Sequence, residues 1–137
     1  MKKLLAVFVA FLVFANVNAQ GKQYKIVFDF ASSDTADQSG IIRQINNVLR
    51  NSPGTNVEVV FHGKAIYNLV KSTTAFKEKL DDLVNNKGVI LAACNNSMNR
   101  YNIKKEDLIP VAIVVPVAII ELADKQEKGW SYIRAGH

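Results

Sequence analysis

The feature that most constrains the fold of this 137-residue chain is a series of short apolar runs separated by segments with helical spacing. The runs are largely continuous and have strand length; they cover residues 24–30, 57–61, 88–93, 111–115 and 130–134. Continuous apolar strands are usually buried on both faces, as in a parallel sheet covered by helices. The sequence therefore predicts one α/β domain of three layers, with about five mostly parallel strands, flavodoxin-like in outline.

Helices are predicted between the runs, where apolar residues recur at helical spacing. The predicted helices cover residues 38–50, 66–70, 74–85 and 117–128, and residues 99–108 are expected to contain irregular or short helical turns. Asp37 is the predicted N-cap of the first helix, Asn51-Ser52-Pro53-Gly54 ends that helix, and Gly129 ends the last.

Ligands in an open α/β sheet bind at the carboxyl ends of the strands. The segments at those ends are residues 31–37, 62–65, 94–98 and Pro116. The first of them contains no glycine, so its backbone cannot wrap closely around a phosphate, and we interpret it as a capped helix entry. The only imidazoles are His62 and His137, and no cysteine or histidine pair has metal-ligand spacing. We therefore expect neither a cofactor nor a metal.

The first nineteen residues are predicted to be a secretory signal rather than part of the fold. Lys2 and Lys3 precede an apolar run over residues 4–14, and a more polar stretch follows that ends at the small residue Ala19. The alternative, an N-terminal membrane anchor, is disfavoured because this run is too short to span a hydrocarbon core comfortably. We expect cleavage after Ala19, a periplasmic protein, and a single α/β domain over residues 20–137.

Composition and charge exclude several classes of protein. Hydrophobic residues make up 49% and charged residues 21% of the chain, which is a globular balance, and its length allows one domain. One cysteine cannot build a disulfide framework. Loss of Lys2 and Lys3 lowers the formal net charge from +5 to +3, and the remaining basic residues are scattered. Nucleic-acid binding is therefore not expected, because it requires a clustered basic surface.

Cys94 is the first candidate functional residue. It follows a predicted central strand and precedes the polar segment Asn95-Asn96-Ser97. Backbone N–H groups of a helical turn at this point would lower the pKa of the Cys94 thiol and favour the thiolate, which is the nucleophilic form. A lone cysteine is either buried and inert or a functional free thiol, and both interpretations stay open. The polar flank favours an accessible position.

His62 is the second candidate, because it ends another predicted strand and is followed by Gly63. Neighbouring strand ends would bring its imidazole near Cys94, where it would orient or deprotonate the thiol. The alternative is a hydrogen-bonded structural histidine at a turn.

Several motifs together resemble those of a known family. They are Phe61-His62-Gly63, Ala93-Cys94-Asn95-Asn96-Ser97-Met98, the strand ending Val114-Val115-Pro116, Glu121-Leu122, and Gln126 followed by Gly129-Trp130-Ser131-Tyr132-Ile133-Arg134. In this order and spacing they resemble the DsrE/DsrF-like family over nearly all of the chain after residue 19. The chain is most similar to the small, exported, single-domain branch of that family.

The resemblance implies a compact, mostly parallel α/β domain that forms homo-oligomers. Several family members act in sulfur oxidation or sulfur relay, where a cysteine after a central strand carries sulfur as a persulfide. Cys94 matches that position, and His62 and Asn96 match positions that line the same pocket. The expected substrate contacts are Asn95, Asn96, Ser97 and Pro116. The chain departs from the family pattern at Val117, where a small residue such as glycine is expected; a bulkier residue there narrows the pocket or changes a subunit contact.

Two functions remain open at this point. The first is an exported sulfur carrier, or sulfurtransferase-like protein, that exchanges sulfur with donor and acceptor proteins or small sulfur species. The second is a non-catalytic ligand-binding or assembly module in which Cys94 is incidental, since a fold does not by itself establish catalysis. Thiol–disulfide exchange is disfavoured because a single cysteine cannot form an internal disulfide.

Overall fold

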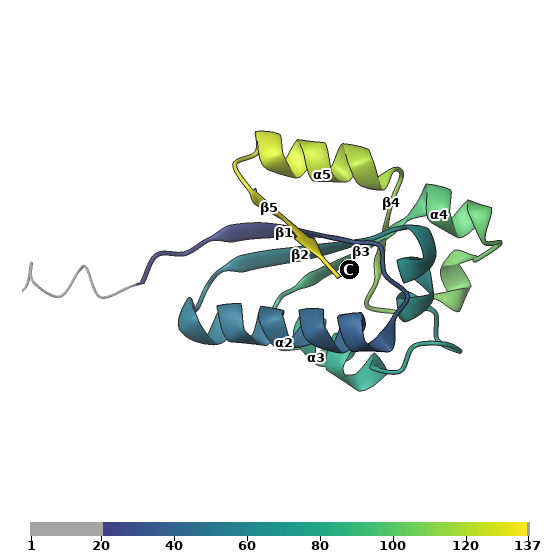
Figure 1. Cartoon of the computed structure of the whole chain (residues 1–137), viewed down its shortest axis with the longest axis horizontal. Coiled ribbons are helices and arrows are strands. Elements are labelled where there is room, and N and C mark those ends of the chain that lie inside the picture. Colours follow the sequence, from purple (N-terminus) through teal and green to yellow (C-terminus); the bar gives the residue numbers. More distant parts are fainter. Residues whose placement is uncertain (1–20, 137) are drawn as a thin grey trace, which may run out of the picture.

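The structure, a computed structural model, describes residues 21–136 (Figure 1). The predicted signal segment, its cleavage point at Ala19 and His137 lie outside the described residues. Within residues 21–136, no helix is long and apolar enough to cross a membrane.

The core of the fold is a five-stranded sheet in which every strand pair is parallel. Its strands are β1 (Lys25–Phe30), β2 (Asn56–Phe61), β3 (Ile90–Cys94), β4 (Ile113–Val115) and β5 (Ser131–Ala135). Their order is β4-β3-β2-β1-β5, so the chain steps outward from β1 to β4 and then returns to the far side of β1. This finding confirms the predicted α/β domain, although the order differs from the 2-1-3-4-5 order of flavodoxin.

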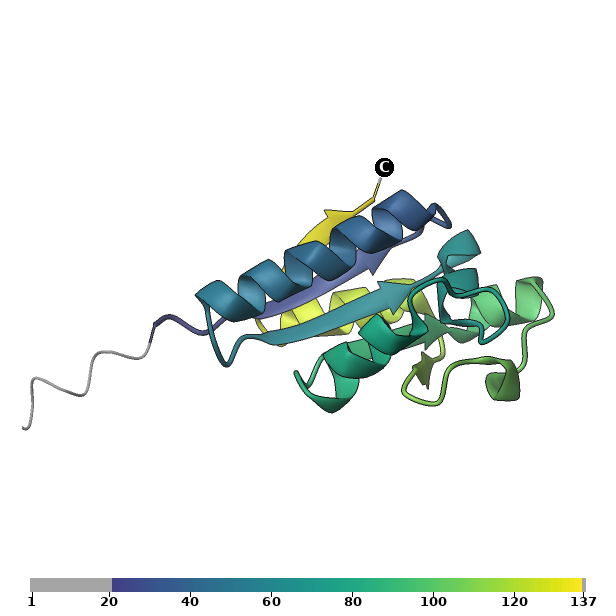
Figure 2. The same cartoon turned by 90° about the horizontal axis from the view of Figure 1, so that it is seen from below.

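Helices cover both faces of the sheet and make three layers (Figures 1 and 2). The long helices are α2 (Thr35–Asn51), α3 (Lys77–Asn85) and α5 (Ala118–Glu127), and the shorter ones are η1 (Gly63–Leu69), α4 (Asn95–Arg100) and η2 (Lys105–Asp107). Helices α2 and α3 lie on one face, whereas α5 crosses the opposite face.

The two faces of the sheet differ in the size of their apolar cores. The larger core lies on the side of α2 and α3 and includes Phe30, Ile45 and Phe61. The smaller core lies beneath α5 and contains Val27, Val60, Ala92, Cys94, Val115, Ala118 and Leu122. Cys94 therefore belongs to the thinner side of the molecule, beneath a single helix.

Several helix starts differ from those predicted. Helix α2 begins at Thr35, and its N-cap is Asp34 rather than Asp37; the Asp34 carboxylate accepts a hydrogen bond from the Ala36 N–H at 2.6 Å. Helix α3 begins at Lys77, after a turn, rather than at residue 74. Helix α4 begins at Asn95, immediately after β3 and before the predicted turns at residues 99–108. These differences concern local capping, which apolar spacing does not report.

Candidate functional site

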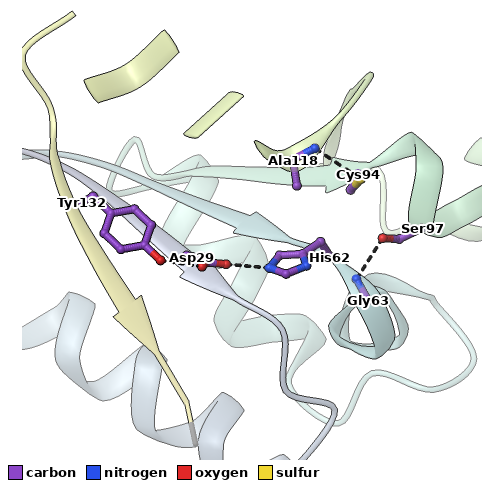
Figure 3. Close-up of polar contacts among 7 residues, drawn as sticks. All are labelled: Asp29, His62, Gly63, Cys94, Ser97, Ala118 and Tyr132. Atoms are coloured by element: carbon purple, nitrogen blue, oxygen red, sulfur yellow. Dashed lines mark hydrogen bonds and ion pairs between the residues drawn. The ribbon is translucent and has the colours of Figure 1, made fainter. Parts of the chain in front are cut away.

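Cys94 lies where the sheet meets two helix N-termini. It is the last residue of β3 and the N-cap of α4. Its Sγ accepts a hydrogen bond from the backbone N–H of Ala118, the first residue of α5, at 3.3 Å (Figure 3). The Cys94 side chain accepts no capping hydrogen bond from the first turn of α4. The backbone N–H groups of Asn96 and Ser97 and the Ser97 hydroxyl nevertheless lie near enough to this sulfur to lower the pKa of the thiol.

These groups change the acidity of the thiol. Burial alone raises the pKa of Cys94, but the nearby polar groups of Ser97, Ala118 and Asn96 outweigh it, and the pKa lies below its ordinary value. The N–H groups that cause this effect are first-turn groups with no partner inside their own helices. The site therefore favours the thiolate, as expected for a helical turn that follows Cys94.

The expectation that Cys94 is accessible is wrong. The residue is only 4% exposed, because α5 covers it on one side and α4 starts without an intervening loop. Asn96 is exposed and Asn95 is half-buried, whereas Ser97 turns inward. The polar flank thus belongs to the first turn of a helix rather than to an open loop.

The expected substrate contacts are Asn95, Asn96, Ser97 and Pro116, and they differ in burial and in their position relative to the Cys94 sulfur. Ser97 contacts it through both its hydroxyl and its N–H, and its Oγ also accepts a hydrogen bond from the Gly63 N–H at 2.8 Å. Asn96 contacts it through the backbone only. Asn95 opens α4, and Pro116 is exposed two residues before Ala118.

Val117 has ordinary extended backbone angles, φ −143° and ψ 122°, as the N-cap of α5. Its conformation therefore requires no glycine at the position where the family pattern has a small residue. The side chain is half-buried.

His62 lies at the same sheet edge as Cys94. The pairing of β2 with β3 ends at Phe61 and Ala93, so His62 and Cys94 are the next residues on neighbouring strands and share one face. The hydrogen bond of His62, however, runs to Asp29, whose Oδ1 is 2.6 Å from the His62 Nε2. The donors to Cys94 come from α4 and α5 instead. The predicted deprotonation of Cys94 by His62 stays a prediction.

Asp29 and Tyr132, which carry no motif that points to a function, complete a polar cluster with His62. The Tyr132 hydroxyl donates to the Asp29 Oδ2 at 2.6 Å, which leaves both carboxylate oxygens hydrogen-bonded (Figure 3). This hydrogen bond, together with the negative charge of Asp29, raises the pKa of Tyr132. One signal was available in the sequence: Asp29 is a carboxylate between apolar residues of β1.

Comparisons with known proteins place this geometry in context. A family model described as the DsrE/DsrF-like family matches residues 9–135. No curated protein sequence matches the chain. A protein of unknown function, MTH1491 from Methanobacterium thermoautotrophicum, has a similar structure, with a TM-score of 0.77 and 23% identity, over 82% of this chain and 99% of that chain. The ychN protein from E. coli has a TM-score of 0.65 and 11% identity, over 82% and 99% of the respective chains. At these identities the two solved structures show a shared fold.

Proposed function

The chain belongs to the DsrE/DsrF-like family, and from that premise we propose that it is a sulfur carrier, or sulfurtransferase-like protein, that holds sulfur as a persulfide on Cys94. The observation that carries this proposal is the set of hydrogen-bond donors that surround the Cys94 sulfur and lower the pKa of the thiol.

The chemistry needs one nucleophilic sulfur. The Cys94 thiolate attacks the outer sulfur of a donor R–S–S–H; the new S–S bond forms as the donor's S–S bond breaks, and the electron pair leaves with the donor thiolate. The N–H groups that favour the thiolate also favour the charged form of the resulting persulfide. One cysteine is sufficient to accept and pass on one sulfur atom.

The burial of Cys94 supports this function in an exported protein. A thiolate that is exposed to an oxidising compartment is readily converted to a sulfenic acid or a disulfide. Cys94 is 4% exposed and is covered by α5, which shelters the sulfur from bulk oxidant. We propose a periplasmic location, which rests on the signal pattern of residues 1–19.

A second candidate is a non-catalytic assembly module, in which the same burial makes Cys94 an inert core residue. Exposed apolar side chains in the first turn of α5 favour it: Ile119 is 76% exposed and Ile120 is 59% exposed. Such residues commonly mark contacts between proteins. We propose a homo-oligomer in either case.

Intact-mass spectrometry after exposure of the protein to polysulfide or thiosulfate separates the two functions. Because Cys94 is the only cysteine, any thiol-linked sulfur must reside on it. The sulfur carrier should gain one or more sulfur atoms that a reductant removes, and Cys94→Ser should gain none.

The rate at which iodoacetamide alkylates Cys94 is the second measurement, and it reports whether the thiol reacts in the folded protein. For a sulfur carrier we expect alkylation of the folded protein at neutral pH. A protein that takes up no sulfur, and whose Cys94 is alkylated only after unfolding, would be the assembly module instead.

A further inference from the structure

We propose that Asp29 and Tyr132 are positioning residues that fix the imidazole of His62, and that His62 supplies the proton to the thiolate that leaves when Cys94 takes up sulfur. This inference rests on the proposed function, because it assigns the proton transfer of that reaction.

Three separate segments of the chain place their side chains in this cluster. Asp29 lies on β1, His62 directly follows β2, and Tyr132 lies on β5. In the sequence, His62 is 33 positions from Asp29, and Tyr132 is 103 positions from Asp29. The chain leaves β1 for α2 on one face of the sheet and enters β5 from α5 on the other. The cluster therefore joins three strands that neighbour one another in the sheet but lie far apart in the sequence.

The hydrogen bonds of the cluster determine which nitrogen of His62 carries a proton. An ionised carboxylate only accepts hydrogen bonds, so the Nε2 of His62 must carry the proton that faces Asp29. The Tyr132 hydroxyl occupies the other carboxylate oxygen and keeps the carboxylate in place. This arrangement selects one tautomer and leaves Nδ1 as the ring nitrogen for proton transfer.

The groups that stabilise the Cys94 thiolate are distinct from the His62 imidazole. The hydrogen-bond donors to its sulfur come from α4 and α5. The proton of His62 is therefore not needed to form or hold the thiolate. His62 is the next residue to Cys94 across β2 and β3, on the same face, and its side chain is 33% exposed. It is placed to act on a molecule that approaches the sulfur from solvent.

The step balances without an oxidant or a reductant. The Cys94 thiolate attacks the outer sulfur of a hydropersulfide R–S–S–H, the donor's S–S bond breaks, and the leaving R–S⁻ takes a proton from protonated His62. The products are a Cys94 hydropersulfide, R–SH and neutral His62, which accepts a proton again when the sulfur is passed on. The substrate class that requires this acid is the alkyl hydropersulfide, since its leaving thiolate is strongly basic.

Leaving-group dependence provides the test. Loading of the full chain from glutathione persulfide is compared with the reaction of Cys94 with dithiodipyridine, whose leaving group is weakly basic and needs no acid. We expect His62→Gln and Asp29→Asn to slow loading from the persulfide by roughly 100-fold, the lower end of the range for one general acid. Tyr132→Phe should slow it by a few-fold, and all three should react with dithiodipyridine at close to the wild-type rate.

A spectroscopic readout separates positioning from a merely structural role. The ¹⁵N shifts of His62 should show the Nε2–H tautomer in the wild type and in Tyr132→Phe, and a mixture of tautomers in Asp29→Asn. Tyr132→Phe changes an exposed residue, which keeps the test valid should Asp29→Asn fold poorly.

The outcomes are distinguishable. If the wild type loads sulfur from the persulfide and the variants load it as fast as the wild type, this inference is overturned and the sulfur carrier stands. If the wild type loads from no persulfide, the proposed function fails and this inference fails with it.

Discussion

Burial and hydrogen bonding shift the pKa of the Cys94 thiol in opposite directions. Burial disfavours the charged thiolate, whereas four polar groups at the starts of α4 and α5 favour it. Three of them are backbone N–H groups, which only a substitution to proline would remove. The fourth, the Ser97 hydroxyl, can be deleted by a substitution that leaves the backbone unchanged.

Ser97→Ala should raise the pKa of Cys94 toward its ordinary value, because it removes the hydroxyl that favours the thiolate. It also removes the acceptor of the Gly63 N–H, which should lower the free energy of unfolding by about 1 kcal/mol. The pH dependence of iodoacetamide alkylation reports the thiol pKa. Asn96→Ala is the matched control, since Asn96 contacts the sulfur only through its backbone; an equal shift in both variants would contradict this account.

The lowered pKa of Cys94 also predicts a pH dependence of stability. A thiol whose pKa is lower in the folded than in the unfolded state adds stability above the unfolded pKa, and that stability is lost as the pH falls through the folded value. The difference in urea midpoint between wild type and Cys94→Ala should therefore shift in favour of the wild type as the pH rises through this window. A difference that does not vary with pH would count against a stabilised thiolate.

Tyr132 should ionise at higher pH than an ordinary tyrosine, because the hydrogen bond to Asp29 and the charge of that carboxylate raise its pKa. The stability that this hydrogen bond contributes is present below the ordinary tyrosine pKa and is lost as the pH rises through the folded value. Ultraviolet titration of tyrosinate, with Tyr132→Phe to identify the group, measures the shift. Asp29→Asn should return the phenol to ordinary behaviour; a high pKa retained in that variant would assign the shift to another cause.

At the scale of elements, α5 is held on its face of the sheet by one buried ion pair as well as by apolar contacts. The Lys125 Nζ is 2.5 Å from the Glu58 Oε2 on β2 and 3.5 Å from the Glu121 Oε1. It also lies 4.5 Å from the centre of the Trp130 ring. Glu58 is 1% exposed, and burial raises its pKa against the opposing effect of Lys125. The same helix supplies the Ala118 N–H to Cys94, so its seating on the sheet affects the candidate site.

Lys125→Met should lower the free energy of unfolding by about 3–5 kcal/mol, because it leaves the Glu58 carboxylate buried without its cation. The loss should grow with rising pH, since a carboxyl group whose pKa is raised in the folded state destabilises the protein as it ionises. Urea unfolding at several pH values measures both effects. The double variant Lys125→Met/Glu58→Gln is the control and should recover much of the loss; a double variant as unstable as the single one would show that Lys125 acts through packing alone.

At the scale of the whole molecule, the sheet is covered unequally. Within residues 21–136, helices α2 and α3 both lie on one face, whereas α5 crosses the other (Figures 1 and 2). Apolar side chains remain exposed on α5 and on the edge strands β4 and β5, among them Ile119, Ile120, Ile113 and Ile133. A surface of this kind is consistent with the proposed homo-oligomer, because association removes apolar area from water.

The wild type should sediment as an oligomer, and Ile119→Lys/Ile120→Lys should sediment as a folded monomer, because two charges in the first turn of α5 cannot be buried without partners. Analytical ultracentrifugation with circular dichroism makes the measurement. Lys128→Ala, at the exposed far end of the same helix, should leave the assembly unchanged. A wild type that sediments as a monomer would contradict the proposed homo-oligomer.

The sequence alone was sufficient for the elements and for the position of the candidate nucleophile. Continuous apolar runs such as residues 88–93 predict buried parallel strands, because only a sheet covered on both faces accommodates them. Cys94 was predicted at a strand end from the run that precedes it, and the structure places it there. These inferences succeed because local periodicity encodes which faces of an element are buried.

Only the tertiary structure decided which side chains meet. The bond of His62 to Asp29, the bond of Tyr132 to the same carboxylate and the cover of Cys94 by Ala118 all depend on where β5 and α5 return to the sheet. Strand order and the seating of α5 result from packing between segments far apart in the chain, and no local pattern reports them. The chain's own residues thus determined a parallel α/β domain with a cysteine at a strand end, whereas long-range packing determined that this cysteine is buried, rich in hydrogen-bond donors and next to a positioned histidine.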